Sequence, residues 1–90
     1  MENMRTPIPD TWLMYAEAKG DSSDELRKYS KEQIQYLADK LRDIIAKTES
    51  CIEGSEYHIQ QLNDYAKFDW MLEATRIQNT VYAVYEKKLS

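Results

Sequence analysis

The sequence has few of the residues that interrupt helices. Its 90 residues include two glycines and two prolines, and both residue types commonly mark turns and helix ends. Long helices are therefore expected. No segment alternates apolar and polar residues for long enough to predict a strand, so we predict an all-α chain. A chain of this length forms one domain with a modest core, which self-association would stabilise further.

Cysteine and long apolar runs are also lacking. The single cysteine, Cys51, excludes an internal disulfide and is typical of a reducing compartment. The apolar runs are far shorter than the ~20 residues that span a bilayer, and residues 1–10 show no secretory signal. These features predict a cytoplasmic protein without a membrane segment.

Positive charge is in deficit, which narrows the possible ligands. The net charge of −4 argues against binding DNA or RNA, because such binding requires a basic surface. Two or three neighbouring lysines or arginines can nevertheless hold a small phosphorylated ligand.

Residues with catalytic or metal-binding chemistry are scarce. His58 is the only histidine, so paired-histidine catalysis and histidine-rich metal sites are excluded. Glu49 and Glu53 flank Cys51 and disfavour its thiolate form. Neither glycine belongs to a spaced phosphate-binding motif, and the carboxylates resemble solvated helix faces rather than a catalytic pair. We therefore predict that the chain is not an enzyme and needs no metal or cofactor.

Three helices are predicted. The first spans about residues 11–19, with Asp10 as its N-cap and Gly20 just beyond its last residue. The second spans about residues 31–53, and the connection DSSDELRK between them is polar, with room for a further helical turn. The third spans about residues 56–88. A short turn between two long helices makes them antiparallel neighbours, so the predicted architecture is a long antiparallel helical hairpin with a short N-terminal helix.

The second helix has a strong start signal and one apolar face. Ser30 and Gln33 form a capping-box pattern, while Tyr29 and Ile34 form a hydrophobic staple. Apolar residues then recur at helical spacing, which predicts a single buried face. That face contains Ile34, Leu37, Leu41, Ile44, Ile45, Thr48 and Ile52.

The predicted third helix is unusually apolar. Large side chains cover a broad arc and a second patch, whereas an ordinary surface helix shows an apolar stripe little more than ~100° wide. The arc contains Ala66, Trp70, Met71, Ala74, Ile77, Val81, Tyr82, Val84, Tyr85 and Leu89, and the patch contains Tyr65, Phe68, Leu72 and Ala83. We predict that other copies of the chain cover the excess, in a compact homo-oligomer. The alternative is that the first helix and the N-terminal residues cover it.

Aromatic residues are abundant and lie among scattered lysines and arginines. Seven tyrosines accompany two tryptophans and one phenylalanine, and such a mixture can stack on nucleobases and pair with phosphates. Phe68, Trp70 and Tyr82 are assigned to the core. Trp12, Tyr15 and Tyr29 are freer to contact a ligand.

Gln78 is a polar residue within the apolar arc. A buried amide needs a hydrogen-bond partner, and for Gln78 this partner is another helix, water or a ligand. A bond to another helix would set the register of the two helices.

Two segments resemble the phage anti-CBASS sponges, a family of small helical proteins. YSKEQIQYLADKLRDII resembles the start of that family's first long helix. ATRIQNTVYAV resembles its closing helix, in which Thr-x-Leu-Gln precedes large apolar residues; the matching residues here are Thr75, Ile77 and Gln78.

The resemblance implies a compact helical hexamer that binds cyclic dinucleotides, such as cyclic GMP-AMP, between protomers. The implied mechanism is that the bound ligand is withheld from a CBASS effector in the infected bacterial host. The ligand is not cleaved and is unchanged when it is released. The family implies contacts from a tyrosine near the N-terminus and from a lysine in the first long helix. Lys40 lies nearest to that lysine, and Tyr15 or Tyr29 takes the place of the tyrosine.

The resemblance also implies a separate pocket for cyclic trinucleotides, which uses arginine and threonine. Thr75 and Arg76 are the nearest candidates in this sequence, and Gln78 of the matched motif joins them as a candidate ligand-binding residue.

Two hypotheses of another class compete with ligand binding. A small inhibitor or adaptor would dock an exposed apolar helix face on a partner protein. A mimic of nucleic acid would need a denser array of carboxylates than the interspersed charges of this chain.

Overall fold

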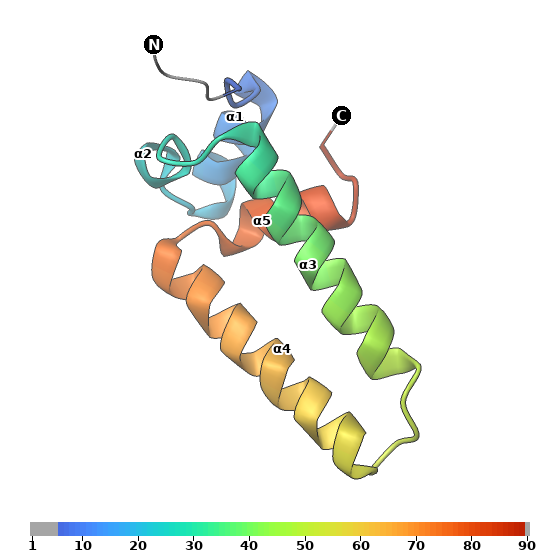
Figure 1. Cartoon of the computed structure of the whole chain (residues 1–90). Helices are drawn as coiled ribbons and strands as arrows, with labels where there is room; N and C mark the ends of the chain where they lie inside the picture. Colours follow the sequence, from blue (N-terminus) through green and yellow to red (C-terminus); the bar gives the residue numbers. More distant parts are fainter. Residues whose placement is uncertain (1–5, 90) are drawn as a thin grey trace.

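The computed structural model describes residues 6–89. This part of the chain forms five helices within a body of 46 × 31 × 24 Å. α3 and α4 form a long antiparallel pair, and α1, α2 and α5 gather at one end of it (Figure 1). The helices are α1 (Asp10–Lys19), α2 (Ser23–Leu26), α3 (Lys31–Glu49), α4 (Glu56–Thr75) and α5 (Gln78–Tyr85). The all-α prediction and the antiparallel pair are confirmed.

The short N-terminal helix lies within a residue of its predicted bounds. Gly20 ends α1 in the left-handed conformation, with φ of 93°, which glycine adopts without steric cost. The predicted cap is wrong, because Pro9 is the N-cap and Asp10 is the first helical residue. There the carboxylate of Asp10 still interacts favourably with the helix dipole.

The capping box at the start of α3 is confirmed. The Gln33 backbone N–H donates to Ser30 Oγ over 3.1 Å, and the Ser30 backbone N–H donates to Gln33 Oε1 over 2.6 Å. The predicted end at residue 53 is wrong, since α3 ends at Glu49. The side chains of Ser50 and Cys51 both donate to the carbonyl of Lys47, and such local bonds compete with continuation of the helix.

The predicted single helix over residues 56–88 is also wrong. α4 ends at Thr75, and Arg76 takes the left-handed conformation with φ of 62°. The Ile77 backbone N–H then donates to the Leu72 carbonyl over 3.4 Å, the pattern of a Schellman helix end. Ile77, like Leu72, is fully buried. Turning the chain here buries apolar residues that a straight helix would carry away from the core.

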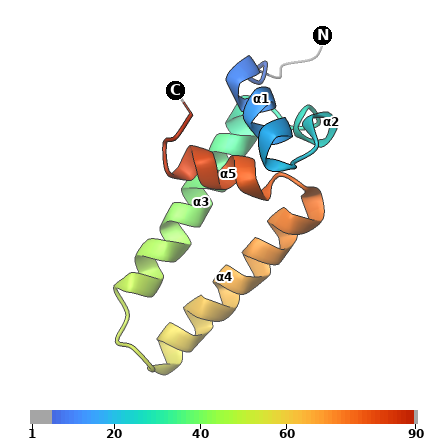
Figure 2. The ribbon, with the colours of Figure 1, turned by 180° about the vertical axis from the view of Figure 1, so that it is seen from behind.

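Charged side chains hold both ends of α5. Asp21 is only 8% exposed, and its carboxylate accepts bonds from the Thr80 backbone N–H over 2.8 Å and from Thr80 Oγ1 over 2.9 Å. At the other end, Arg42 Nη2 donates to the Tyr85 carbonyl over 3.0 Å. A carboxylate at the N-terminus and a guanidinium at the C-terminus both complement the helix dipole, so α5 is fixed across α3 beside α1 (Figure 2).

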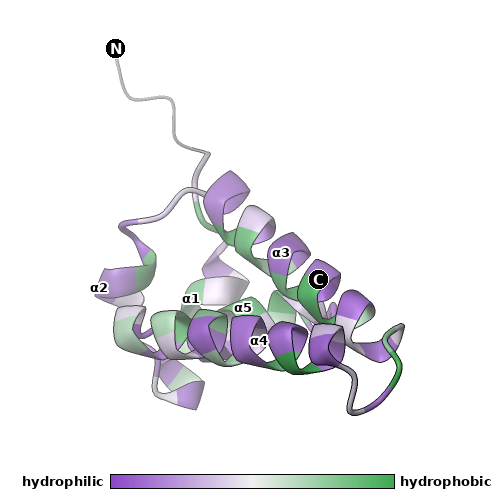
Figure 3. Ribbon diagram, turned by 60° about the horizontal axis from the view of Figure 1, so that its bottom comes forward, coloured by the Kyte–Doolittle hydropathy of each residue, from purple (hydrophilic) through white to green (hydrophobic). Residues whose placement is uncertain are grey.

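The core joins residues from all five helices. It contains Trp12, Ala16, Leu26, Ile34, Ala38, Leu41, Ile44, Phe68, Leu72, Ile77, Val81 and Val84. Much of the apolar arc predicted for the third helix is therefore covered by the chain itself, because α5 folds back onto α3. α4 still carries hydrophobic as well as hydrophilic residues along its length (Figure 3). Within residues 6–89, no helix has the length and apolar character needed to cross a membrane.

Candidate ligand-binding groove

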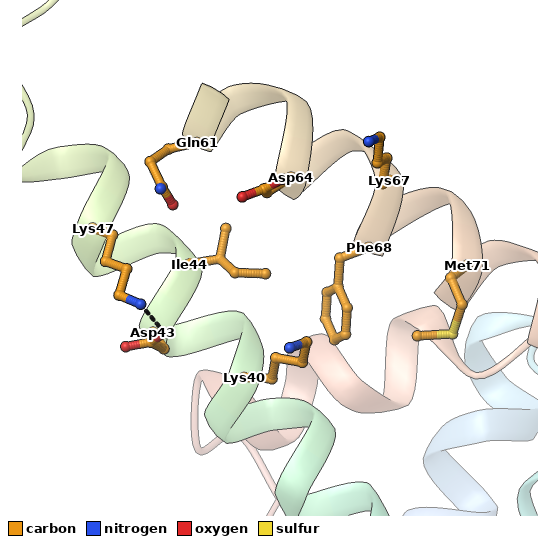
Figure 4. A pocket seen from close by; sticks show the side chains of 9 residues that line it. All are labelled: Lys40, Asp43, Ile44, Lys47, Gln61, Asp64, Lys67, Phe68 and Met71. Carbon is orange, nitrogen blue, oxygen red and sulfur yellow. Dashed lines mark ion pairs between the residues drawn. The ribbon is translucent and has the colours of Figure 1, made fainter. Parts of the chain in front are cut away.

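A groove separates the facing sides of α3 and α4 (Figure 4). Its volume is about 530 Å³, within the ~300–1,000 Å³ typical of small-molecule sites. It is lined by Lys40, Asp43, Ile44, Lys47, Gln61, Asp64, Lys67, Phe68 and Met71. We call this feature the α3–α4 groove.

Helical spacing places these side chains on facing surfaces. Residues three, four and seven apart share one side of a helix. Lys40 and Lys47 are so related on α3, as are Gln61 and Phe68 on α4. Because the helices are antiparallel, Lys40 lies across from Phe68 and Lys47 lies nearer to Gln61 (Figure 4).

The lysines of the groove differ in their partners. Lys47 Nζ lies 3.1 Å from Asp43 Oδ2, and the hydrogen bond and charge of Asp43 raise the pKa of Lys47 above its ordinary value. Lys40 and Lys67 have no carboxylate within salt-bridge distance among residues 6–89. Two exposed ammonium groups are therefore available to an anion.

Gln61 is the most unusual residue of the groove. It is 7% exposed, and its side-chain amide points from α4 into the space facing α3 (Figure 4). Within the described part of the chain, the amide makes no hydrogen bond. Buried amides are nearly always bonded, and an unmet group costs ~1–3 kcal/mol. The amide therefore needs a partner from outside the chain, such as water or a ligand.

The base of the groove is apolar. Ile44 and Phe68 are buried, and Met71 is half-buried beside them. The other six lining residues are polar or charged, so the groove is more polar than a typical small-molecule site. The groove can thus bind a molecule with a flat apolar part, hydrogen-bonding edges and negative charge.

Residues of possible catalytic or metal-binding chemistry are engaged elsewhere. His58 Nδ1 accepts a bond from the Gly54 backbone N–H over 3.1 Å, and Cys51 Sγ donates to the Lys47 carbonyl over 2.9 Å. In the portion of the chain that the structure describes, no group of three histidine, cysteine or acidic residues is placed to hold a metal ion.

Of the six predicted ligand-binding residues, Lys40 lies in the groove. Tyr15 lies on α1, with Lys19 Nζ 5.8 Å from the centre of its ring. Tyr29 precedes α3 and lines a different pocket, beside Leu13. Neither tyrosine lines the groove, so a site that combined them with Lys40 would need residues from more than one copy of the chain.

The other three candidates lie at the turn between α4 and α5. Thr75 Oγ1 donates to the Leu72 carbonyl over 2.8 Å, and Arg76 is the exposed left-handed residue of the turn. Gln78 Nε2 donates to Asp69 Oδ1 over 2.7 Å. The bond between Gln78 and Asp69 joins two helices, as one of the alternatives for Gln78 predicted.

A polar network extends this junction. Asp69 Oδ1 also accepts a bond from the Tyr82 hydroxyl over 2.8 Å, and that hydroxyl is hydrogen-bonded to the hydroxyl of Tyr65. Burial, followed by these hydrogen bonds, raises the pKa of Tyr82 above its ordinary value. Tyr82 therefore stays protonated and links α5 to α4.

The assignment of the two tryptophans was wrong. Trp12, expected to be free for a ligand, is 6% exposed and belongs to the core, whereas Trp70, expected in the core, is 71% exposed. The prediction for Trp70 assumed that one helix continued through Ile77 and Val81. Because α4 ends at Thr75, the buried face of α4 is set by Phe68 and Leu72 instead.

Trp70 is part of an exposed apolar surface that we call the α4 stripe. Its members recur at intervals of three or four residues along α4 and all are exposed, although Leu62 also borders residues of α3. They are Ile59, Leu62, Ala66, Trp70 and Ala74. Lys67 and Met71 adjoin Ala66 and Trp70 on one side and line the α3–α4 groove on the other.

Five groove residues on α4 were not predicted as ligand contacts: Gln61, Asp64, Lys67, Phe68 and Met71. Their spacing was visible in the sequence, but Gln61 and Asp64 had no distinguishing signal beside the other polar residues of this helix.

Comparisons with protein-family models, with curated proteins and with solved structures give no match to the chain.

Proposed function

We propose that the chain binds a cyclic dinucleotide in the α3–α4 groove and so keeps this signal from a CBASS effector. The ligand is not cleaved and is unchanged when it is released. The observation that carries this proposal is Gln61, a buried amide without a hydrogen-bond partner among residues 6–89, in a groove that also carries the lysines Lys40 and Lys67. The cytoplasm of an infected bacterial host is the proposed location.

The chemistry of the groove matches that of the ligand. A cyclic dinucleotide carries two negative phosphates, and Lys40 and Lys67 offer two ammonium groups free of carboxylates among residues 6–89. Its bases have flat apolar faces that fit against Ile44 and Phe68. Binding requires no reactive group, so a chain with these side chains can sequester the molecule without turning it over.

Self-association is part of the proposal. The α4 stripe leaves Trp70 and four other apolar residues exposed, and symmetric contact between copies would cover them. A copy bound there would lie next to Lys67 and Met71, at the edge of the groove. The resemblance to the sponge family suggests a hexamer. In such an assembly Tyr15 or Tyr29 of one copy would reach the ligand held by another.

The resemblance also motivates a second pocket for cyclic trinucleotides near Thr75 and Arg76. Gln78 would contribute to it indirectly, because its bond to Asp69 positions the turn between α4 and α5.

Calorimetric titration with cyclic GMP-AMP tests the proposal. Lys40→Ala and Lys67→Ala should each weaken binding about tenfold or more, because each removes a charged hydrogen bond to phosphate. Lys31→Ala, which removes an exposed lysine of α3 outside the groove, is the matched control and should bind as the wild type does. Heating the complex should return intact ligand.

Three results would contradict it. Absence of binding heat with the wild-type chain would exclude a sponge, and recovery of a cleaved nucleotide would indicate an enzyme. If both Lys40→Ala and Lys67→Ala bound the ligand as tightly as the wild type, the ligand would lie outside the α3–α4 groove.

A second candidate function is a protein-binding adaptor or inhibitor. It is favoured by the exposure of Trp70 with Ile59 and Leu62 on one side of α4, since an apolar helix face can dock in the groove of a partner. A wild-type chain that stays monomeric and binds no cyclic nucleotide would support this function instead.

A further inference from the structure

Two polar side chains on α4 offer directional hydrogen bonds in the groove, in addition to its charges. Gln61 and Asp64 are three residues apart and both line the groove, so they share one side of the helix. The Asp64 carboxylate points toward the Gln61 side chain (Figure 4). Among the described residues, Asp64 has neither a salt bridge nor a hydrogen-bond partner, so both groups are free to contact a ligand.

We infer that Gln61 and Asp64 select guanine among the bases of the bound cyclic dinucleotide; this inference rests on the proposed function. An ionised carboxylate only accepts hydrogen bonds, whereas a glutamine amide both donates and accepts. The Watson–Crick edge of guanine presents two donors, N1–H and N2–H, beside the acceptor O6. Asp64 can accept both donors while the Gln61 amide donates to O6.

Adenine fits the same pair of groups poorly. Its Watson–Crick edge has one donor, the N6 amine, beside the acceptor N1. With its N6 amine on Asp64 and its N1 on the Gln61 amide, adenine forms two hydrogen bonds where guanine forms three, and the carboxylate receives one donor instead of two. Sites built around hydrogen bonds reject analogues that leave their polar groups unsatisfied.

The charge distribution along the groove supports a base rather than a phosphate at Asp64. The end near Gln61 carries the carboxylates of Asp43 and Asp64 against the single ammonium of Lys47. The remaining lysines, Lys40 and Lys67, lie toward Phe68 (Figure 4). A phosphate is repelled at the first end and attracted at the second, so the base of a ligand lying along the groove reaches Gln61 and Asp64.

Paired titrations with cyclic di-GMP and cyclic di-AMP test this inference on the full chain. The wild type should bind cyclic di-GMP about tenfold more tightly or better, the discrimination that one bidentate base contact supplies. Asp64→Asn should remove most of this preference by weakening cyclic di-GMP about tenfold without weakening cyclic di-AMP. Glu73→Gln, which removes an exposed carboxylate of α4 outside the groove, should keep the wild-type preference.

Each other outcome contradicts the inference. Equal affinity of the wild type for both ligands, or an undiminished preference in Asp64→Asn, would overturn base selection while leaving sequestration intact. Failure of the wild type to bind either ligand would overturn sequestration and base selection together. Asp64 is exposed, so its substitution should leave the thermal unfolding of the chain unchanged, and this measurement confirms that the variant is folded.

Discussion

At the scale of single residues, the buried polar side chains of residues 6–89 are hydrogen-bonded with one exception. The carboxylate of Asp21 is buried but accepts three hydrogen bonds, two from Thr80 and one from Asn79. Gln61 is buried to a similar degree without a partner among residues 6–89. The first arrangement stabilises the fold, whereas the second costs stability that only an external partner can restore.

The unmet amide predicts that Gln61→Met stabilises the free protein. Methionine has a similar length and shape and leaves no unpaired polar group, so the free energy of unfolding should rise by about 1 kcal/mol. In a domain of this size, that change raises Tm by ~4–8 °C. Thermal unfolding followed by circular dichroism measures the shift.

Gln60→Met is the matched control, because Gln60 is the exposed neighbour on the same helix. It should change the free energy of unfolding by no more than ~0.5 kcal/mol. A lower Tm for Gln61→Met than for the wild type would mean that the amide is satisfied in solution.

At the scale of helices, the end of α4 is the decisive feature. Arg76 adopts a left-handed conformation, which costs a residue with a side chain ~1–2 kcal/mol. The cost is offset because the turn buries Ile77 and directs α5 across α3, where Asp21 and Arg42 bind its two ends. The position of the groove follows from this turn, since α5 covers one end of the α3–α4 pair and leaves the other open.

Arg76→Gly tests whether α4 ends at this residue. A helix end here and a continuous helix predict changes of opposite sign in the free energy of unfolding. At a left-handed position, glycine relieves the clash of the side chain and should stabilise the protein by about 0.5–1 kcal/mol. If one helix continued through this residue, the same substitution would destabilise it by ~1 kcal/mol. Chemical denaturation measures the difference. Glu73→Gly, within α4, provides the comparison and should destabilise the protein.

At the scale of the whole molecule, α4 serves two surfaces. One side faces the core and the α3–α4 groove, and the opposite side is the α4 stripe. The sequence predicted more apolar surface on residues 56–88 than the chain itself can cover. Part of this surface is covered from within the chain, because α5 folds back onto α3, and the α4 stripe remains exposed. Lys67 and Met71 lie between the two surfaces, so contact at the stripe and binding in the groove would influence one another.

Trp70→Glu should convert the proposed oligomer into a monomer. A charge placed in an apolar contact loses its hydration without a partner, whereas on the exposed surface of the free chain it costs little. Sedimentation equilibrium should show the mass of a single chain, with a Tm close to that of the separated wild-type protomer. Tyr36→Glu, at an exposed aromatic residue of α3, is the control and should keep the wild-type mass. A wild-type chain that is monomeric at all concentrations would refute the self-association.

The sequence by itself determined the all-helical class, the start of α3 and the antiparallel pairing of α3 with α4. These features depend on local interactions, such as the bonds between Ser30 and Gln33, and on the scarcity of residues that interrupt helices. Tertiary structure decided where α4 ends, which tryptophan is buried and which polar residues face the groove. Each of these outcomes depends on the free energy gained when distant segments pack together, which can exceed the local cost of a left-handed Arg76 and is not encoded in the spacing of residues along one helix.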